Sequence, residues 1–128
     1  MIESIKLTTV AAVGANGSAT ATGYSIHVAG KIHAVHVAYL DSPPAGTTDF
    51  TLSDEGDPAS ESIITLTDAA TDIKIYPRRL TETNDGTDIT YDNTRKVYDY
   101  YIVEGRLEAT IAQANAGDYC NVTVWIER

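Results

Sequence analysis

Gly105-Arg106-Leu107-Glu108-Ala109-Thr110-Ile111-Ala112 is a stretch in which apolar and polar side chains alternate without a break. Successive side chains of a β-strand point to opposite faces, so a period of two is typical of a strand with one buried face. Residues 120–126 alternate in the same way, after a connection rich in Asn, Ala and Gly. Two such stretches with a short Gly-containing connection predict a β-hairpin. Its inward side chains are expected to be Leu107, Ala109, Ile111, Val122, Val124 and Ile126.

The remaining sequence has the same β-strand character. Residues 24–28 and 31–40, separated by Ala29-Gly30, predict a second hairpin, and residues 11–22 consist almost entirely of small or hydroxyl-bearing side chains. Further strand-like stretches cover residues 4–10, 48–53, 62–67, 72–76 and 97–103, and residues 78–99 are a polar excursion with turn signals. No stretch shows a convincing helical period. We predict an all-β, single-domain antiparallel β-sandwich, jelly-roll-like or immunoglobulin-like, with about eight short strands. The domain spans residues 1–128, and residues 1–22 form a first strand followed by a flexible loop or arm.

Composition limits the possible partners. The formal net charge of −9 argues against binding to nucleic acid or to an anionic membrane, because both require basic patches. The single cysteine, Cys120, excludes an internal disulfide and is expected to be a small buried hydrophobe. The sequence shows no signal peptide and no apolar stretch of the ~20 residues that span a bilayer, so synthesis in the cytoplasm is predicted.

Metal-binding and catalytic patterns are weak. His33 and His36 face opposite sides of a regular strand, and His27 could meet His33 only across a hairpin, without a Cys or carboxylate to complete a zinc site. The acidic loops 54–57 and 84–88 do not match calcium-loop spacing and are typical of tight turns. No nucleophile elbow or phosphate-binding loop is present. We therefore predict no metal, no cofactor and no enzymatic activity; a hydrolase would need two carboxylates in a cleft.

Charge is distributed unevenly along the chain. Between Ile32 and Ile73 the sequence contains no Lys or Arg. Acidic residues accumulate there, namely Asp41, Asp49, Asp54, Glu55, Asp57, Glu61, Asp68 and Asp72. Cationic residues then cluster at Lys74, Arg78, Arg79, Arg95, Lys96 and Arg106, with several tyrosines close by. Arg and Tyr are enriched at protein interfaces. The predicted partner-binding residues are Arg78, Arg79, Arg95, Lys96, Tyr98, Tyr100 and Arg106.

Three stretches carry a resemblance to a known group of proteins. Ile73-Lys-Ile-Tyr-Pro-Arg, the alternating stretch 103–112 and the closing Gly117-Asp-Tyr-Cys-Asn-Val-Thr-Val are similar in layout to small all-β virion proteins of tailed bacteriophages. Residues 34–49 give a looser match. Such proteins commonly decorate capsids or serve as other head accessories, and the group has no catalytic residues to assign.

This resemblance implies a structural role in a virion. The expected function is that of a capsid decoration (cement) protein, a late product made in the host cytoplasm, that binds the outer capsid surface and stabilises the head. The expected partners are the major capsid protein and further copies of the chain, with a trimer favoured. The N-terminal segment could contribute by strand addition. The alternative is a carbohydrate- or receptor-binding β-sandwich of a phage tail or fibre.

Overall fold

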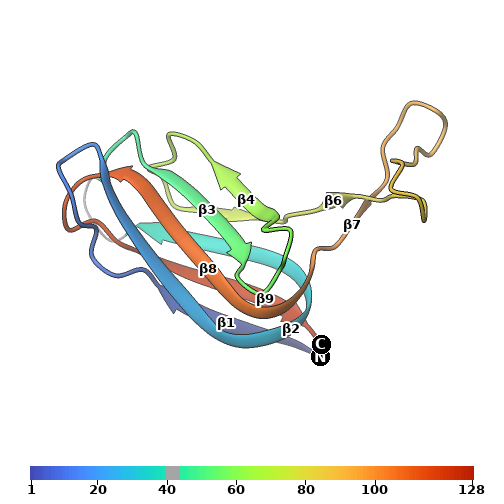
Figure 1. Cartoon of the computed structure of the whole chain (residues 1–128), viewed down its shortest axis with the longest axis horizontal. Coiled ribbons are helices and arrows are strands. Elements are labelled where there is room, and N and C mark those ends of the chain that lie inside the picture. Colours follow the sequence, from blue (N-terminus) through green and yellow to red (C-terminus); the bar gives the residue numbers. More distant parts are fainter. Residues whose placement is uncertain (40–43) are drawn as a thin grey trace.

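The computed structural model describes residues 1–39 and 44–128, and every regular element in it is a β-strand. In chain order the strands are β1 (Ile2–Thr8), β2 (Ala19–Tyr39), β3 (Asp49–Asp54), β4 (Ser62–Leu66), β5 (Ile73–Ile75), β6 (Arg79–Leu80), β7 (Tyr98–Asp99), β8 (Ile102–Ala114) and β9 (Cys120–Glu127). Seven strands form one antiparallel sheet in the order β1-β9-β2-β8-β3-β4, with β5 paired to β2, while β6 and β7 form a separate ribbon (Figure 1). The predicted all-β antiparallel sandwich class is confirmed.

Strand β2 organises the sheet because it belongs to both layers of the sandwich. Its first part pairs with β8, from Ala19 to Lys31, and its second part pairs with β9, from Lys31 to Tyr39. One layer is therefore β4-β3-β8 with the first part of β2, and the other is β5, the second part of β2, β9 and β1. The change of layer falls at Gly30, where φ is +144° and the pairing changes from β8 to β9. Figure 1 shows β2 bending around this end of the molecule.

One apolar core lies between the two layers. The largest fully buried side chains are Phe50 and Leu52 of β3, Leu107 and Ile111 of β8, and Ile32 and Ile126 from the second layer. The polar residues between them on β8 and β9 point outward, which gives the alternating burial of both strands. All six inward side chains predicted for residues 107–126 are buried, between 0 and 1% exposed.

The pairing of these strands differs from the prediction. β8 and β9 are not hydrogen-bonded to each other: β8 pairs with β2 and β3, and β9 pairs with β1 and β2. The connection 115–119 crosses from one layer to the other, and within it the Asp118 carboxylate accepts a hydrogen bond from the Asn115 amide at 2.8 Å. The predicted hairpin of residues 105–126 is therefore wrong. An alternating pattern identifies the buried face of a strand but not the strand beside it.

The second predicted hairpin is also wrong. Residues 24–28 and 31–39 belong to the single strand β2, which has 21 residues, so the strands are not uniformly short. Gly30 allows the backbones of β2 and β9 to approach each other closely, because a Cβ atom at this position would lie 2.2 Å from the Glu127 carbonyl oxygen. Two irregularities in pairing, between Tyr24 and His27 and between Ile32 and Ala34, accommodate the bend. The predicted end of the strand at residues 40–43 lies outside the described residues.

The N-terminal segment is more ordered than a flexible arm. The first strand lies at Ile2–Thr8 in place of residues 4–10, and β2 already begins at Ala19. The connection between them is tied to the 115–119 crossing and to the end of β8, since the Ala12 amide donates to the Asp118 carbonyl at 2.8 Å and the Gly17 amide donates to the Ala114 carbonyl at 2.9 Å. The predicted loop of residues 11–22 is thus shorter and fixed by backbone hydrogen bonds.

The polar excursion forms an arm that projects away from the sandwich (Figure 1). We define the arm as residues 79–99; β6 and β7 form its base, and residues 81–97 form its knob. Two tight turns close the knob, with the Thr83 amide donating to the Thr87 carbonyl at 2.8 Å and the Tyr91 amide donating to the Arg95 carbonyl at 2.7 Å. No side chain of the arm is buried. The arm therefore has no core of its own.

Cys120 lies in the core, as predicted, and it makes stability sensitive to alkaline pH. Its side chain is 0% exposed, and burial raises the pKa of the thiol from 9.0 to about 11. A raised pKa in the folded state means that this stabilisation is complete below pH 9 and is lost as the pH rises towards 11. We expect a loss of about 2–3 kcal/mol over this range. Urea unfolding from pH 8 to pH 11 measures it, and a Cys120→Ala variant should lack this part of the slope; an equal slope in both proteins would contradict the assignment.

Candidate partner-binding surfaces

Arg78 and Tyr100 fasten the arm to the sandwich. The Arg78 guanidinium lies 4.2 Å from the centroid of the Tyr100 ring, and its Nη1 donates hydrogen bonds to the carbonyls of Pro77 at 2.7 Å and His33 at 3.1 Å. The His33 ring packs against the Tyr100 ring with a centroid distance of 4.7 Å. Both predicted partner-binding residues are therefore engaged within the chain, where they hold the direction of the arm.

A histidine–carboxylate pair extends this cluster onto β9. His33 Nε2 lies 2.9 Å from Glu127 Oε2, and this hydrogen bond is the main cause of the lowered pKa of the Glu127 carboxyl. A lowered pKa in the folded state favours folding above the ordinary pKa of the carboxyl, and the effect is lost as the pH falls through the folded value. Glu127 is exposed enough that solvent weakens this pair, so its role is to position the His33 ring beneath the arm.

The other predicted cations on the arm have acidic neighbours on the same surface. Arg79 Nη2 lies 2.8 Å from Glu82 Oε1, and Arg95 Nε lies 3.1 Å from Asp92 Oδ2. Exposed ion pairs three residues apart contribute little stability and exchange partners readily. Lys96 and Tyr98 lie on the return strand of the arm and are exposed. These four residues are therefore available to a neighbouring molecule.

Arg106 belongs to a different surface. It lies on β8, in the first layer, where its Nε and Nη2 atoms bind both oxygens of Glu55 at 2.6 and 2.8 Å. This two-bond contact lowers the pKa of Glu55 and raises that of Arg106. The guanidinium also lies 4.2 Å from the centroid of the Tyr24 ring. The seven predicted residues thus do not form one surface: four lie on the arm, Arg78 and Tyr100 flank its base, and Arg106 lies elsewhere.

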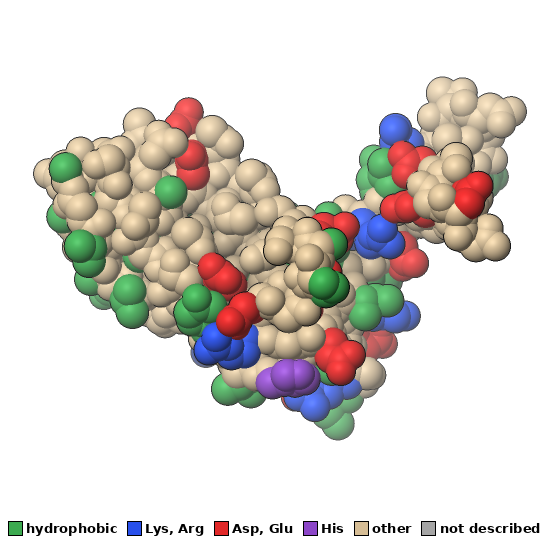
Figure 2. All heavy atoms as spheres, in the orientation of Figure 1, with side chains coloured by type: hydrophobic (Ala, Val, Ile, Leu, Met, Phe, Trp, Pro, Cys, Tyr) green, Lys and Arg blue, Asp and Glu red, His purple; other side chains and the backbone are tan. Residues whose placement is uncertain are grey.

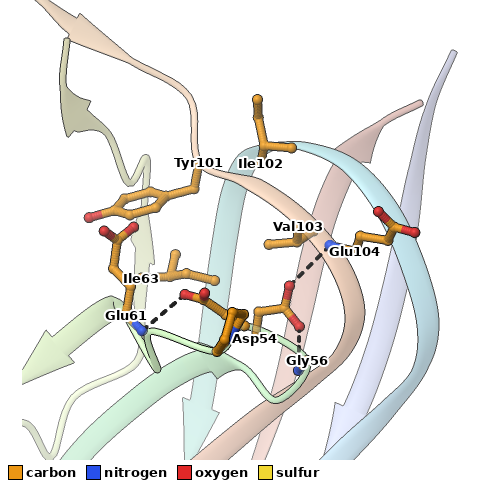
Figure 3. A pocket seen from close by; sticks show the side chains of 10 residues that line it. Asp54, Gly56, Glu61, Ile63, Tyr101, Ile102, Val103 and Glu104 are labelled. Carbon is orange, nitrogen blue, oxygen red and sulfur yellow. Dashed lines mark hydrogen bonds between the residues drawn. The ribbon is translucent and has the colours of Figure 1, made fainter. Parts of the chain in front are cut away.

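The structure contains a cleft of about 330 Å³ beside the arm base, which was not predicted from the sequence (Figure 3). It lies between the loop after β3 and the start of β8, and Tyr101, Ile102 and Val103 form one wall. Burial is the main cause of the raised pKa of Tyr101, and the nearby Glu61 carboxylate adds to it. The acidic lining residues are Asp54, Asp57, Glu61 and Glu104.

Two of these carboxylates build the cleft. Asp54 accepts hydrogen bonds from the Gly56 amide at 2.9 Å and from the Glu104 amide at 3.0 Å, which ties the loop to β8. Asp57 accepts from the amides of Ala59 and Glu61 at 3.0 and 3.1 Å. Each carboxylate therefore uses both oxygens on backbone donors, as Figure 3 shows for Asp54. This arrangement is that of turn-forming Asp residues.

Three further observations complete the description of the surface. Among residues 1–39 and 44–128, no group of three or more His, Cys, Asp or Glu side chains is placed to hold a metal ion. In the same part of the chain no helix is long and apolar enough to cross a membrane. The acidic residue Asp41 lies outside the described residues.

No model of a known protein family matches the chain, and neither does any curated protein or solved structure.

Proposed function

We propose that this chain is a structural protein of a tailed-bacteriophage virion, and specifically a capsid decoration protein that binds the outer surface of the head. In this role it makes lateral contacts on the shell and stabilises it. Its partners are the major capsid protein and neighbouring copies of the chain. The resemblance of residues 73–78, 103–112 and 117–124 to small all-β virion proteins supports this assignment.

The arm is the observation that carries the proposal. A two-stranded ribbon on its own is at best marginally stable in water, because it buries too little apolar surface. The arm nevertheless extends away from the sandwich with no buried side chain of its own (Figures 1 and 2). It exposes Tyr91 and Tyr98 by 77% and 58%, and tyrosine is enriched at protein interfaces. A projection of this kind gains its stability by lying on a neighbouring molecule, as it would on an assembled shell.

The charge of the chain agrees with a shell-bound role. At −9, many copies crowded on one surface repel each other wherever their acidic faces meet. Salt screens this repulsion beyond about 8–10 Å but not at close contact. The mixed charges of the arm, with Arg79, Arg95 and Lys96 exposed or partly exposed, provide a contact at which acid does not face acid.

Removing the arm is expected to abolish capsid binding without unfolding the sandwich. Because Arg79 and Asp99 are directly opposite each other in the ribbon, residues 80–98 can be replaced by Asn-Gly, which closes a two-residue hairpin. The melting temperature should change by only about 4 °C or less, since a loss of no more than ~1 kcal/mol is expected. Co-sedimentation with heads assembled without this chain measures binding, and we expect at least a tenfold loss of occupancy.

A matched variant separates the arm from its fastening. Arg78→Gln keeps the arm but removes the charged contact with Tyr100, so it should retain folding and bind with intermediate occupancy. Wild-type protein that fails to bind heads would contradict the proposed function. Arm-deleted protein that coats heads at wild-type occupancy would show that the sandwich, and not the arm, makes the contact.

A further inference from the structure

The outer face of the second layer carries a row of side chains that includes two lysines and a histidine, which are far apart in the sequence. Lys6 of β1 is opposite Thr123 of β9, Thr123 is opposite His36 of β2, and His36 is opposite Lys74 of β5. Val35, Val37, Val122 and Val124, which alternate with them, are buried in the core. The row therefore points away from the core, and both lysines are exposed.

An aromatic pair borders this row. Trp125, the single tryptophan, is opposite Ser4 on one side and Ala34 on the other, so it lies on the same outer face. The Lys74 ammonium lies 4.4 Å from the centroid of the Trp125 ring and 5.6 Å from that of Tyr76. We call Lys6, His36, Lys74, Tyr76 and Trp125 the cationic face. Two lysines, a histidine and two aromatic rings on one sheet face suit a partner that presents carboxylates.

The knob of the arm has the complementary chemistry. It carries four carboxylates and two cationic side chains, namely Glu82, Asp85, Asp88, Asp92, Arg95 and Lys96. Figure 2 shows these acidic side chains on the knob, which a narrow neck separates from the sandwich. Hydrogen bonds from Thr83 and Thr87 lower the pKa of Asp85, so this carboxyl is ionised at neutral pH.

One pair in the knob is unfavourable in isolation. Glu82 and Asp88 are directly opposite each other in an antiparallel bridge, and like charges in this position destabilise a ribbon. Arg79 offsets the charge of Glu82 from the side, whereas Asp88 has no cationic partner among the described residues. A surface that brings two lysines to this pair would convert a repulsion into two attractions.

We propose that the knob of one copy docks on the cationic face of a second copy. The arm is fastened at Arg78 and Tyr100 and points away from its own sandwich, so a knob reaches this face only on a neighbouring molecule (Figure 1). The contact joins two different surfaces, and copies joined in this way form a ring if the rotation closes. The inference specifies the contact between neighbouring copies and rests on the proposed function for those partners, but self-association of purified protein is measured without heads, so the two proposals can fail separately.

Charge reversal on each side tests the docking with purified protein. Lys6→Glu with Lys74→Glu reverses the face, and Glu82→Lys with Asp88→Lys reverses the knob. Each reversed protein should associate with itself at least tenfold more weakly than wild type in sedimentation-velocity experiments at low salt. An equimolar mixture of the two should restore association between the two variants, because each knob then meets a face of opposite charge on the other variant. Thr65→Glu with Thr67→Glu, exposed on the first layer, adds two of the four negative charges that the face reversal adds, so it tests the effect of net charge away from the face and should leave association unchanged.

Trp125 gives an independent readout of the same event. Its emission should shift to shorter wavelength as wild-type protein is concentrated, and this shift should be absent when Asn-Gly replaces residues 80–98. Wild-type protein that stays monomeric up to about 1 mM at low salt would overturn the proposal. A second result would also overturn it: the face reversal weakens association, but the knob reversal does not, and mixing the two variants does not restore it. The occupant of the face would then be another acidic segment. Far-UV circular dichroism of each variant confirms that the fold is retained.

Discussion

Replacing Gly30 with Ala is expected to destabilise the chain by about 3–5 kcal/mol, because two separate costs act at this position. An added Cβ would lie 2.2 Å from the Glu127 carbonyl oxygen and 3.0 Å from its carbonyl carbon, so backbone rather than a movable side chain must shift. The φ of +144° is in addition a conformation that side chains with a Cβ rarely adopt. Both effects fall where β2 changes layer, and a shift there disturbs its pairing with β8 and with β9.

Two other glycines separate these costs. Gly23 lacks a positive φ, but a Cβ there would meet the Thr8 carbonyl oxygen at 2.3 Å, so Gly23→Ala reports steric overlap alone. Gly117 has a φ of +88° with no atom near its Cβ position, so Gly117→Ala reports backbone strain alone, at about 1–2 kcal/mol. Guanidinium unfolding of the three variants gives the comparison. If Gly30→Ala were no less stable than Gly117→Ala, the close approach at the bend would have to be wrong.

Phe50→Ala is expected to cost about 3–5 kcal/mol, since it removes the largest fully buried side chain from between the layers. Phe50 lies on β3 opposite Ile111 of β8, and it packs in the same core as the inward residues of β9. The cavity left by Ala cannot close fully, because two hydrogen-bonded layers fix the spacing of the walls. Urea unfolding measures the loss.

Two variants on the same sheet provide a comparison for the destabilisation by Phe50→Ala. Phe50→Leu retains most of the buried area and should cost roughly half as much or less. Thr65→Ala, on the exposed face of β4, should stay within about 0.5 kcal/mol of wild type. A small effect of Phe50→Ala, equal to that of Thr65→Ala, would mean that β3 does not pack against the second layer.

The sequence predicts the fold class and the buried faces well. Strict alternation in residues 105–112 and 120–126 identifies Leu107 and Val124 as core residues, and both are 0% exposed. Alternation depends only on which side of a strand meets water, so it can be seen in one stretch at a time. Which strands are neighbours depends on contacts between distant stretches. The pairing of β8 and β9 with β2, and not with each other, therefore leaves no sign in the alternation of either stretch.

Gly30 shows the same limit at a single residue. A Gly between two β-rich stretches is an ordinary signal for a hairpin turn. In this chain it permits a bend and a close backbone approach within one strand. A hairpin turn and a bend of this kind differ in which part of the chain lies beside the glycine. Here it is the backbone of Glu127, which is almost a hundred residues further along the chain.

The candidate surfaces also differ in whether their residues are close together in the sequence or meet only in the fold. The segment 78–100 stands out in the sequence because its Arg and Tyr residues are close together along the chain. The cationic face could not be identified in this way, because Lys6, His36 and Lys74 come from three distant strands and meet only through sheet register. Arg106 illustrates the opposite error: it is near the arm in sequence, but it pairs with Glu55 on the surface of the first layer, away from the arm.

The membership of β2 in both layers has a consequence for how the protein is made. During synthesis β2 leaves the ribosome long before β8 and β9, so neither layer can form while only the first half of the nascent chain is available. Strands β1 and β2 must wait for their distant partners β8 and β9, and the entropy of closing those long loops is lost before that pairing compensates for it. Topologies of this kind fold in milliseconds to seconds rather than microseconds. The apolar face of β2 therefore stays uncovered in the nascent chain until β8 and β9 are translated.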